Sequence, residues 1–143
     1  MDDQEELQDI IKELSELLAK LLVLKKSGKF QGAIDLIDDT LVRYFDFDAA
    51  NTNYVSEEFL NEVYEQKCRI SPYINDSLGE LLAEKGNLLY SQHRYEESRN
   101  ILNNALTIYF LLNENQDFFS FGRMNKMVMI NQKLASIDLN ISR

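Results

Sequence analysis

The sequence has little of the residues that interrupt helices and little of those that build redox or metal sites. One proline and five glycines in 143 residues leave few places for turns, which favours long helices over many short strands. The single cysteine excludes an internal disulfide and is compatible with a reducing compartment. One histidine and one cysteine could form a zinc site only with many carboxylate ligands.

Positive charge and long hydrophobic runs are also scarce. The chain has 15 Lys and Arg residues and 24 Asp and Glu residues, which gives a net charge of -9. Such a charge repels phosphate backbones, so nucleic acid is not an expected partner. The first residues are acidic where a secretory signal needs a basic region, and no apolar run approaches the roughly 20 residues of a membrane span. We therefore expect a cytoplasmic protein without membrane contact.

Hydrophobic residues recur at helical spacing along most of the chain, and sustained period-two alternation is absent. The pattern predicts an all-α fold in one domain, residues 1–143. Short turns between successive helices predict antiparallel hairpins, with the last helix packed against them. About six helices are predicted, at residues 7–26, 30–44, 56–68, 72–92, 95–112 and 118–139.

One pattern occurs twice. Residues 29–45 read KFQGAIDLIDDTLVRYF and residues 94–110 read RYEESRNILNNALTIYF, so both copies end in Tyr-Phe at an offset of 65 residues. The offset places Tyr44 and Tyr109 at equivalent positions. With their preceding helices, the two copies predict repeated units at about residues 14–45 and 79–112.

The second unit contains LLAEKGNLLYSQHRYEESRNILNNAL, which resembles a tetratricopeptide repeat. That motif has a large apolar residue, a Leu-Gly pair and an aromatic on its first helix, then a small residue and a second aromatic on its second helix. In the first unit Leu21 replaces the motif's glycine, so the match is weaker. We expect Gly86 to lie at a close helix contact, where leucine should overpack the contact and alanine should be milder. The matched positions in the second unit are Leu82, Lys85, Gly86, Leu89, Ser98 and Leu102.

The resemblance implies a noncatalytic module that binds a protein or peptide. In tetratricopeptide repeats the first helix of each unit lines a concave surface, where Tyr90 would offer an aromatic contact and Asn87 a bond to a peptide backbone. The five implied residues of the second unit include no lysine, so we expect a basic or neutral partner. The residues implied for this surface are Glu80, Glu84, Asn87, Tyr90 and Ser91, with Lys25 and Lys26 at the rim of the first unit. The leading residues also resemble an uncharacterised family of short bacterial proteins, to which no activity is attached.

Two other interpretations stay open. The chain could be a helical domain that binds a small molecule in an interhelical pocket lined by the two Tyr-Phe pairs. It could also be a structural homodimer, because the first helix has more apolar residues than one hairpin partner ordinarily covers. Its surplus, Ile10, Leu17 and Leu24, should meet either the C-terminal helix or a second copy of the chain.

Catalytic and metal chemistry find little support in the sequence. Residues 46–57 place acids at three positions of a calcium-binding loop, but Ala50 replaces one ligand and Asn51 replaces the glycine of its bend. We interpret the segment as a solvated acidic loop, and His93 and Cys68 as structural residues. No phosphate loop, dinucleotide fingerprint or nucleophile elbow is present. We therefore expect no enzyme activity, no catalytic residues, no cofactor and no metal.

Overall fold

The structure is a computed structural model that describes residues 3–68, 71–115 and 120–142. These ranges contain no strand, which confirms the predicted all-α class. All six predicted helices occur, and α3 continues into a π-helical turn, η1 (Tyr64–Cys68). The last helix begins at Phe121 after its N-cap Ser120 rather than at residue 118, which lies outside the described ranges. The helices are α1 (Asp3–Lys26), α2 (Phe30–Phe45), α3 (Glu57–Val63), α4 (Pro72–Ser91), α5 (Tyr95–Asn115) and α6 (Phe121–Ile141).

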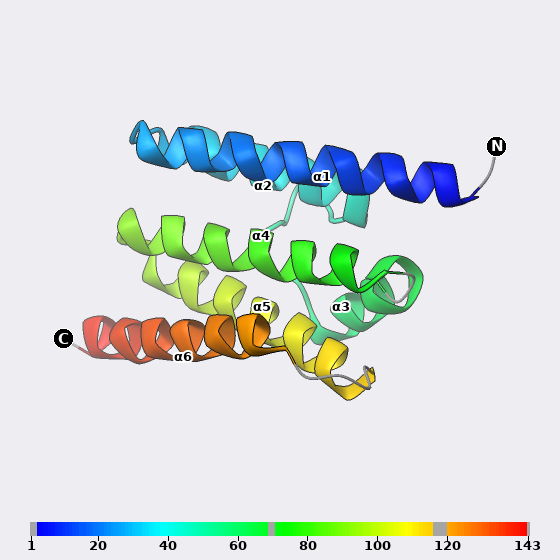
Figure 1. Ribbon diagram of the computed structural model, residues 1–143. Helices are drawn as coiled ribbons and strands as arrows, with labels where there is room; N and C mark the ends of the chain where they lie inside the picture. The colour runs from blue at the N-terminus through cyan, green and yellow to red at the C-terminus, as the bar shows by residue number, and fades with distance from the viewer. Residues whose placement is uncertain (1–2, 69–70, 116–119, 143) are drawn as a thin grey trace.

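The helices stack in layers around α4. Figure 1 shows the α1/α2 hairpin on one side of α4 and the helices α5 and α6 on the other, with α3 at one end of the stack. Helix α4 contacts α1, α2, α5 and α6, whereas α3 packs mainly against α5 and η1. The predicted hairpins α1/α2 and α4/α5 are therefore both present, and α4 is the central helix.

The two hairpin turns have the same backbone structure. Gly28 and His93 lie 65 residues apart, and both have left-handed backbone conformations, with φ angles of 73° and 62°. In both turns the following residue closes a Schellman motif, which satisfies carbonyls at the helix end. These hydrogen bonds join the Lys29 N–H to the Leu24 carbonyl and the Arg94 N–H to the Leu89 carbonyl, both at 2.9 Å.

The α4/α5 hairpin is much closer than the α1/α2 hairpin. A Cβ atom added to Gly86 would lie 2.4 Å from Cδ2 of Leu102, so the predicted close contact at Gly86 is confirmed. At the corresponding place in α1, Leu21 keeps the helices further apart. The side chains at the motif positions of the second unit are all fully buried, namely Leu82, Lys85, Leu89, Ser98 and Leu102.

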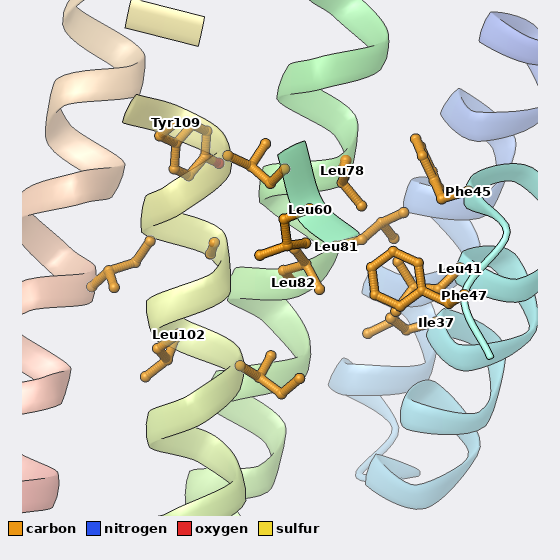
Figure 2. Close-up of a cluster of buried hydrophobic side chains, with 14 of the residues drawn as sticks. Ile37, Leu41, Phe45, Phe47, Leu60, Leu78, Leu81, Leu82, Leu102 and Tyr109 are labelled. Atoms are coloured by element: carbon orange, nitrogen blue, oxygen red, sulfur yellow. The ribbon is translucent and has the colours of Figure 1, made fainter. Parts of the chain in front are cut away.

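The hydrophobic core runs continuously through these layers. Figure 2 shows Leu60 of α3 beside Leu81 and Leu82 of α4, between the α2 side chains on one side and those of α5 on the other. Each of these three leucines is at most 2% exposed. The core therefore joins the two hairpins, because α4 contributes side chains to both of its neighbours.

The two Tyr-Phe pairs have different surroundings although they end matching helices. Tyr109 is 1% exposed and its ring lies against Gly79, whereas Tyr44 is half-buried and donates a hydrogen bond to the Glu13 carboxylate. The residue of α1 equivalent to Gly79 is Leu14, whose buried side chain leaves no room for a tyrosine ring. Tyr44 and Tyr109 are predicted to occupy equivalent positions. The turns of their two hairpins are equivalent, but the two tyrosines differ in burial.

Candidate functional site

The outward-facing side of α4 presents a stripe of four residues at helical spacing, Glu80, Ala83, Glu84 and Asn87, each half-buried. Helix α1 borders this stripe on one side and α6 borders it on the other (Figure 1). Three of the four residues belong to the surface that the tetratricopeptide resemblance implied. The structure thus brings these three predicted residues together on one face.

A groove of about 270 Å³ lies between α4 and α6. Its floor is apolar, with Ala83 from α4 and the buried Ile130 from α6, and the exposed Met129 of α6 lies at its edge. Its two walls differ in charge, because α4 contributes two glutamates and α6 contributes two lysines. The residues that define the groove are Glu80, Ala83, Glu84, Asn87, Lys126, Met129, Ile130 and Lys133.

Ion pairs connect the charged side chains of the groove and its border. Lys126 lies 3.4 Å from Glu80 across the groove, with both side chains about two-fifths exposed. Lys25 of α1 forms an ion pair with Glu84 on the other side of α4. An exposed pair such as Lys126–Glu80 typically contributes less than about 1 kcal/mol, so a partner can displace it at low cost.

The remaining predicted residues lie at the end of the groove or outside it. The Nζ atom of Lys133 is 4.2 Å from the centre of the Tyr90 ring, which also packs edge-on against Tyr95. Ser91 is exposed and donates a hydrogen bond to the Asn87 carbonyl at 3.1 Å. Lys26 is exposed in the last turn of α1, away from the groove lining. Tyr90 therefore borders the groove through Lys133, whereas Ser91 and Lys26 do not line it.

Sequence reasoning missed the half of the groove that α6 supplies. The last helix was expected to pack against the hairpins, and its methionines Met124, Met127 and Met129 were interpreted as core residues rather than as a contact surface. The available signal was the spacing of two lysines around a methionine, Lys126, Met129 and Lys133, on a helix that is otherwise poor in charge.

The three apolar residues predicted as surplus on α1 are half-buried against the hydrophobic core. Ile10 lies near Tyr44 and Phe45, and Leu17 lies near Arg43 and Tyr44, so α2 covers much of this stripe. Figure 1 shows α6 on the opposite side of α4 from α1, so the C-terminal helix is not its cover. The expectation that α6 meets these residues is therefore wrong.

The interhelical pocket predicted from both Tyr-Phe pairs does not form. Tyr109 is buried, while Phe110 is 54% exposed and points away from the core. Tyr44 and Phe45 instead line a separate hollow of about 360 Å³ between α1, α2, η1 and the start of α4. The other residues of this hollow are Glu6, Leu7, Ile10, Gln66, Lys67 and Ile74.

A buried polar network lies on the opposite side of α4 from the groove. Lys85 is fully buried, and its Nζ atom is 2.6 Å from Asp38 of α2 and donates to the carbonyl of Thr52 at 3.3 Å. Burial lowers the pKa of Lys85, and the Asp38 carboxylate partly opposes that shift. Arg94 donates two hydrogen bonds to Glu97 and thereby lowers the pKa of that carboxyl group. This network joins both hairpins to the loop after α2, and we interpret its role as structural.

The acids of the loop after α2 make local contacts. Asp46 lies 3.4 Å from Lys67, and Asp48 accepts a hydrogen bond from the Ala50 N–H at 3.0 Å. Ser56 caps α3 by accepting a hydrogen bond from the Phe59 N–H. Over residues 3–68, 71–115 and 120–142, no three His, Cys, Asp or Glu side chains come together as a metal site would require.

Comparisons with protein-family models, with curated proteins and with solved structures find no match to this chain. None of the helices in the described part of the chain combines the length and the hydropathy that a membrane crossing requires. A functional assignment therefore depends on the geometry of the chain's own surfaces.

Proposed function

We propose that this chain is a noncatalytic interaction module that binds a protein segment in the groove between α4 and α6. The observation that supports this proposal is the groove itself, which combines an apolar floor with polar walls of opposite charge. Interfaces commonly have an apolar centre and a polar rim. The tetratricopeptide resemblance agrees with it, because that family binds partners with the first helix of each unit, the place that α4 has here.

The side chains that line the groove indicate what kind of partner it would bind. Met129 is 65% exposed beside the partly covered Ala83, so these two residues offer an apolar seat for one side chain of a partner. Methionine adapts its shape to varied apolar surfaces. Asn87 has both a donor and an acceptor, as an extended peptide backbone requires. We therefore propose a peptide segment with an apolar anchor residue.

The two walls change the charge that we expect of the partner. The residues of α4 alone predicted a basic or neutral partner, but α6 adds Lys126 and Lys133 opposite the glutamates. A segment that carries a basic residue on its α4 side and an acidic residue on its α6 side would complement both walls. We propose this mixed-charge segment in place of a purely basic one.

A noncatalytic role agrees with where the described side chains with shifted pKa values lie, because all of them, including the Arg94–Glu97 pair, are outside the groove. Burial raises the pKa of the Tyr109 hydroxyl and lowers that of the Lys85 ammonium, and both side chains are inaccessible in the core. Catalytic groups with shifted pKa values are expected in a cleft that a substrate can enter. The groove is lined by two glutamates, two lysines, an asparagine and three apolar side chains.

Peptide selection followed by substitution tests the proposal. A phage-displayed library of random short peptides is selected on the full chain, and affinities of the selected peptides are measured by calorimetry. Asn87→Ala and Met129→Asp should each weaken binding by about tenfold or more, equivalent to about 1.4 kcal/mol. Exchanging the wall charges, with Glu80→Lys and Lys126→Glu together, should favour peptides with the opposite arrangement of charges.

Val23→Asp provides the matched control, because Val23 is 62% exposed on α1 and lies outside the groove. It should leave the affinity unchanged. Selected peptides that bind Met129→Asp as tightly as the unchanged chain would contradict the proposal, and so would a selection that yields no binder.

The separate hollow supports a second candidate function, the binding of a small amphipathic molecule. Its volume of about 360 Å³ falls within the range of small-molecule sites, and Lys67 places a cation beside apolar walls. The probe is anilinonaphthalene sulfonate, whose rings and sulfonate suit such a site. Its fluorescence should rise with the unchanged chain and fall with Ile10→Trp, which fills the hollow. Equal fluorescence with both chains would exclude this candidate.

A further inference from the structure

Helix α6 carries an unusual share of the exposed hydrophobic surface. Twelve large hydrophobic side chains are exposed in the described part of the chain, and six of them belong to this one helix. Such concentrations on a protein surface mark interaction sites more often than isolated exposed residues do. The six residues are Phe121, Met124, Val128, Met129, Leu139 and Ile141.

A line of exposed residues, here called the crest, runs along the side of α6 that faces away from the protein. Its members recur at helical spacing, opposite the buried residues Met127, Ile130 and Ile137. Figure 1 shows that α6 forms the edge of the helix stack, so none of the other helices drawn covers this side. The crest consists of Phe121, Asn125, Val128, Gln132, Ala135 and Leu139, which are all exposed.

The crest contains no charged residue in a chain whose net charge is -9. Lys126 and Asp138 lie on the flanks of α6, where Lys126 meets Glu80 and Asp138 lies 3.6 Å from Arg99, and Arg123 is buried. Three of the six crest residues are large and apolar, namely Phe121, Val128 and Leu139, and depletion of charge is typical of the centre of an interface.

We infer that the crest is the contact surface of a homodimer, in which α6 packs against α6 of a second copy. Two copies of so acidic a chain repel one another, and at the crest no carboxylate has to be buried or brought close to another. In an antiparallel pairing centred on residue 130, Asn125 and the partner subunit's Gln132 are neighbours along the crest, and each has a donor and an acceptor with which to pair. Two crests can therefore contact each other without charge repulsion and with hydrogen-bond partners for their amides.

The spacing of the crest suits a two-fold axis beside Ile130. With the helices antiparallel, Phe121 lies opposite Leu139 of the partner subunit, Val128 opposite Gln132 of the partner subunit, and Asn125 opposite Ala135 of the partner subunit. In each pair the residue numbers add to the same sum, as an isologous contact requires. One helix pair makes a small interface, so we expect association at micromolar rather than nanomolar concentrations.

Sedimentation velocity of the full chain tests the dimer across a hundredfold concentration series in the micromolar range. The mass should rise from monomer to dimer, and added salt should strengthen association because it screens the repulsion between acidic surfaces. Val128→Glu and Gln132→Glu should each weaken association by about tenfold or more. Gln132 is already polar and exposed, so its substitution keeps the test valid if Val128→Glu disturbs folding.

Val23→Glu is the matched control, since Val23 is a similarly exposed valine on α1. It should leave the association constant unchanged. A monomer mass at every concentration and salt level would overturn the inference. A dimer that persists with Gln132→Glu but is lost with Val23→Glu would overturn it as well, because the contact would then involve α1.

Discussion

At the scale of single residues, the absence of side chains at two positions of α4 determines how closely α5 approaches. A Cβ atom at Gly79 would lie 2.6 Å from the ring of Tyr109, and one at Gly86 would lie 2.4 Å from Leu102. Both neighbours are buried in a close-packed core and have little room to move. The sequence alone predicted that alanine at Gly86 would be milder than leucine, and these distances indicate that alanine also forces Leu102 to move.

Gly86→Ala should lower the free energy of unfolding by about 1–3 kcal/mol, because overpacking forces Leu102 from its place. Gly32→Ala is the matched control, since Gly32 is exposed in α2 and its added Cβ would come no closer than 4.0 Å to Lys29. That control should be neutral or stabilising by up to about 1 kcal/mol. Urea unfolding measures both variants, and equal stabilities would mean that the α4/α5 contact is looser than described.

Lys85 occupies the place of a leucine in the tetratricopeptide motif, and the structure explains how a lysine is accommodated there. Lys85→Met should lower the free energy of unfolding by about 1–3 kcal/mol, because Asp38 and the Thr52 carbonyl lose their partner. Adding Asp38→Asn should recover part of this loss, since it removes the uncompensated carboxylate. A double variant less stable than Lys85→Met, measured by urea unfolding, would show that the ion pair does not explain the loss.

The ionisation of Glu97 should account for part of the pH dependence of the free energy of unfolding. Its pKa in the folded state is lowered, chiefly by hydrogen bonds from Arg94. The resulting stabilisation is therefore present above the unfolded pKa of about 4.3 and is lost as the pH falls through the lower folded value. Glu97→Gln should cost about 1 kcal/mol at pH 7 and flatten the loss of stability below pH ~4.3. Glu96→Gln, at an exposed neighbour, should keep the original slope in urea unfolding at each pH.

At the scale of secondary structure elements, the two hairpins share one turn structure, although their helices pack at different distances. The left-handed conformation costs about 1 kcal/mol or more for a residue with a side chain, and His93 incurs this cost where Gly28 does not. His93→Gly should therefore be more stable than His93→Ala by about 1 kcal/mol. Both variants lose the contact between His93 and the Tyr95 hydroxyl, so their difference isolates the backbone. Equal melting temperatures for the two variants would contradict the assignment of this turn.

The helices and hairpins could be predicted from the sequence because their signals are local. Apolar spacing located all six helices, and the turn residues located both hairpin ends. The surroundings of the Tyr-Phe pairs could not be predicted, because they depend on whether Leu14 or Gly79 faces the tyrosine from another helix. The contribution of α6 to the groove was missed for the same reason, since it depends on which helix packs beside α4.

At the scale of the whole molecule, α4 is the centre and three separate surfaces surround it. The groove lies between α4 and α6, the hollow lies among α1, α2 and η1, and the crest lies on the outer side of α6. The groove and the crest adjoin on one helix, with Met129 of the groove one turn from Asn125 and Gln132 of the crest, whereas the groove wall on α4 lies away from the crest. Partner binding and self-association are therefore separable by substitution.

The central claim is that the groove binds the partner, and methyl NMR of the full chain tests it most directly. Spectra are recorded at one protein concentration during titration with a peptide selected from the library. The largest shift changes should occur at Ala83, Met129 and Ile130, the methyl groups of the groove floor and its edge. Changes concentrated at Leu7 and Ile10 in the hollow, or at Val128 and Leu139 on the crest, would contradict the claim.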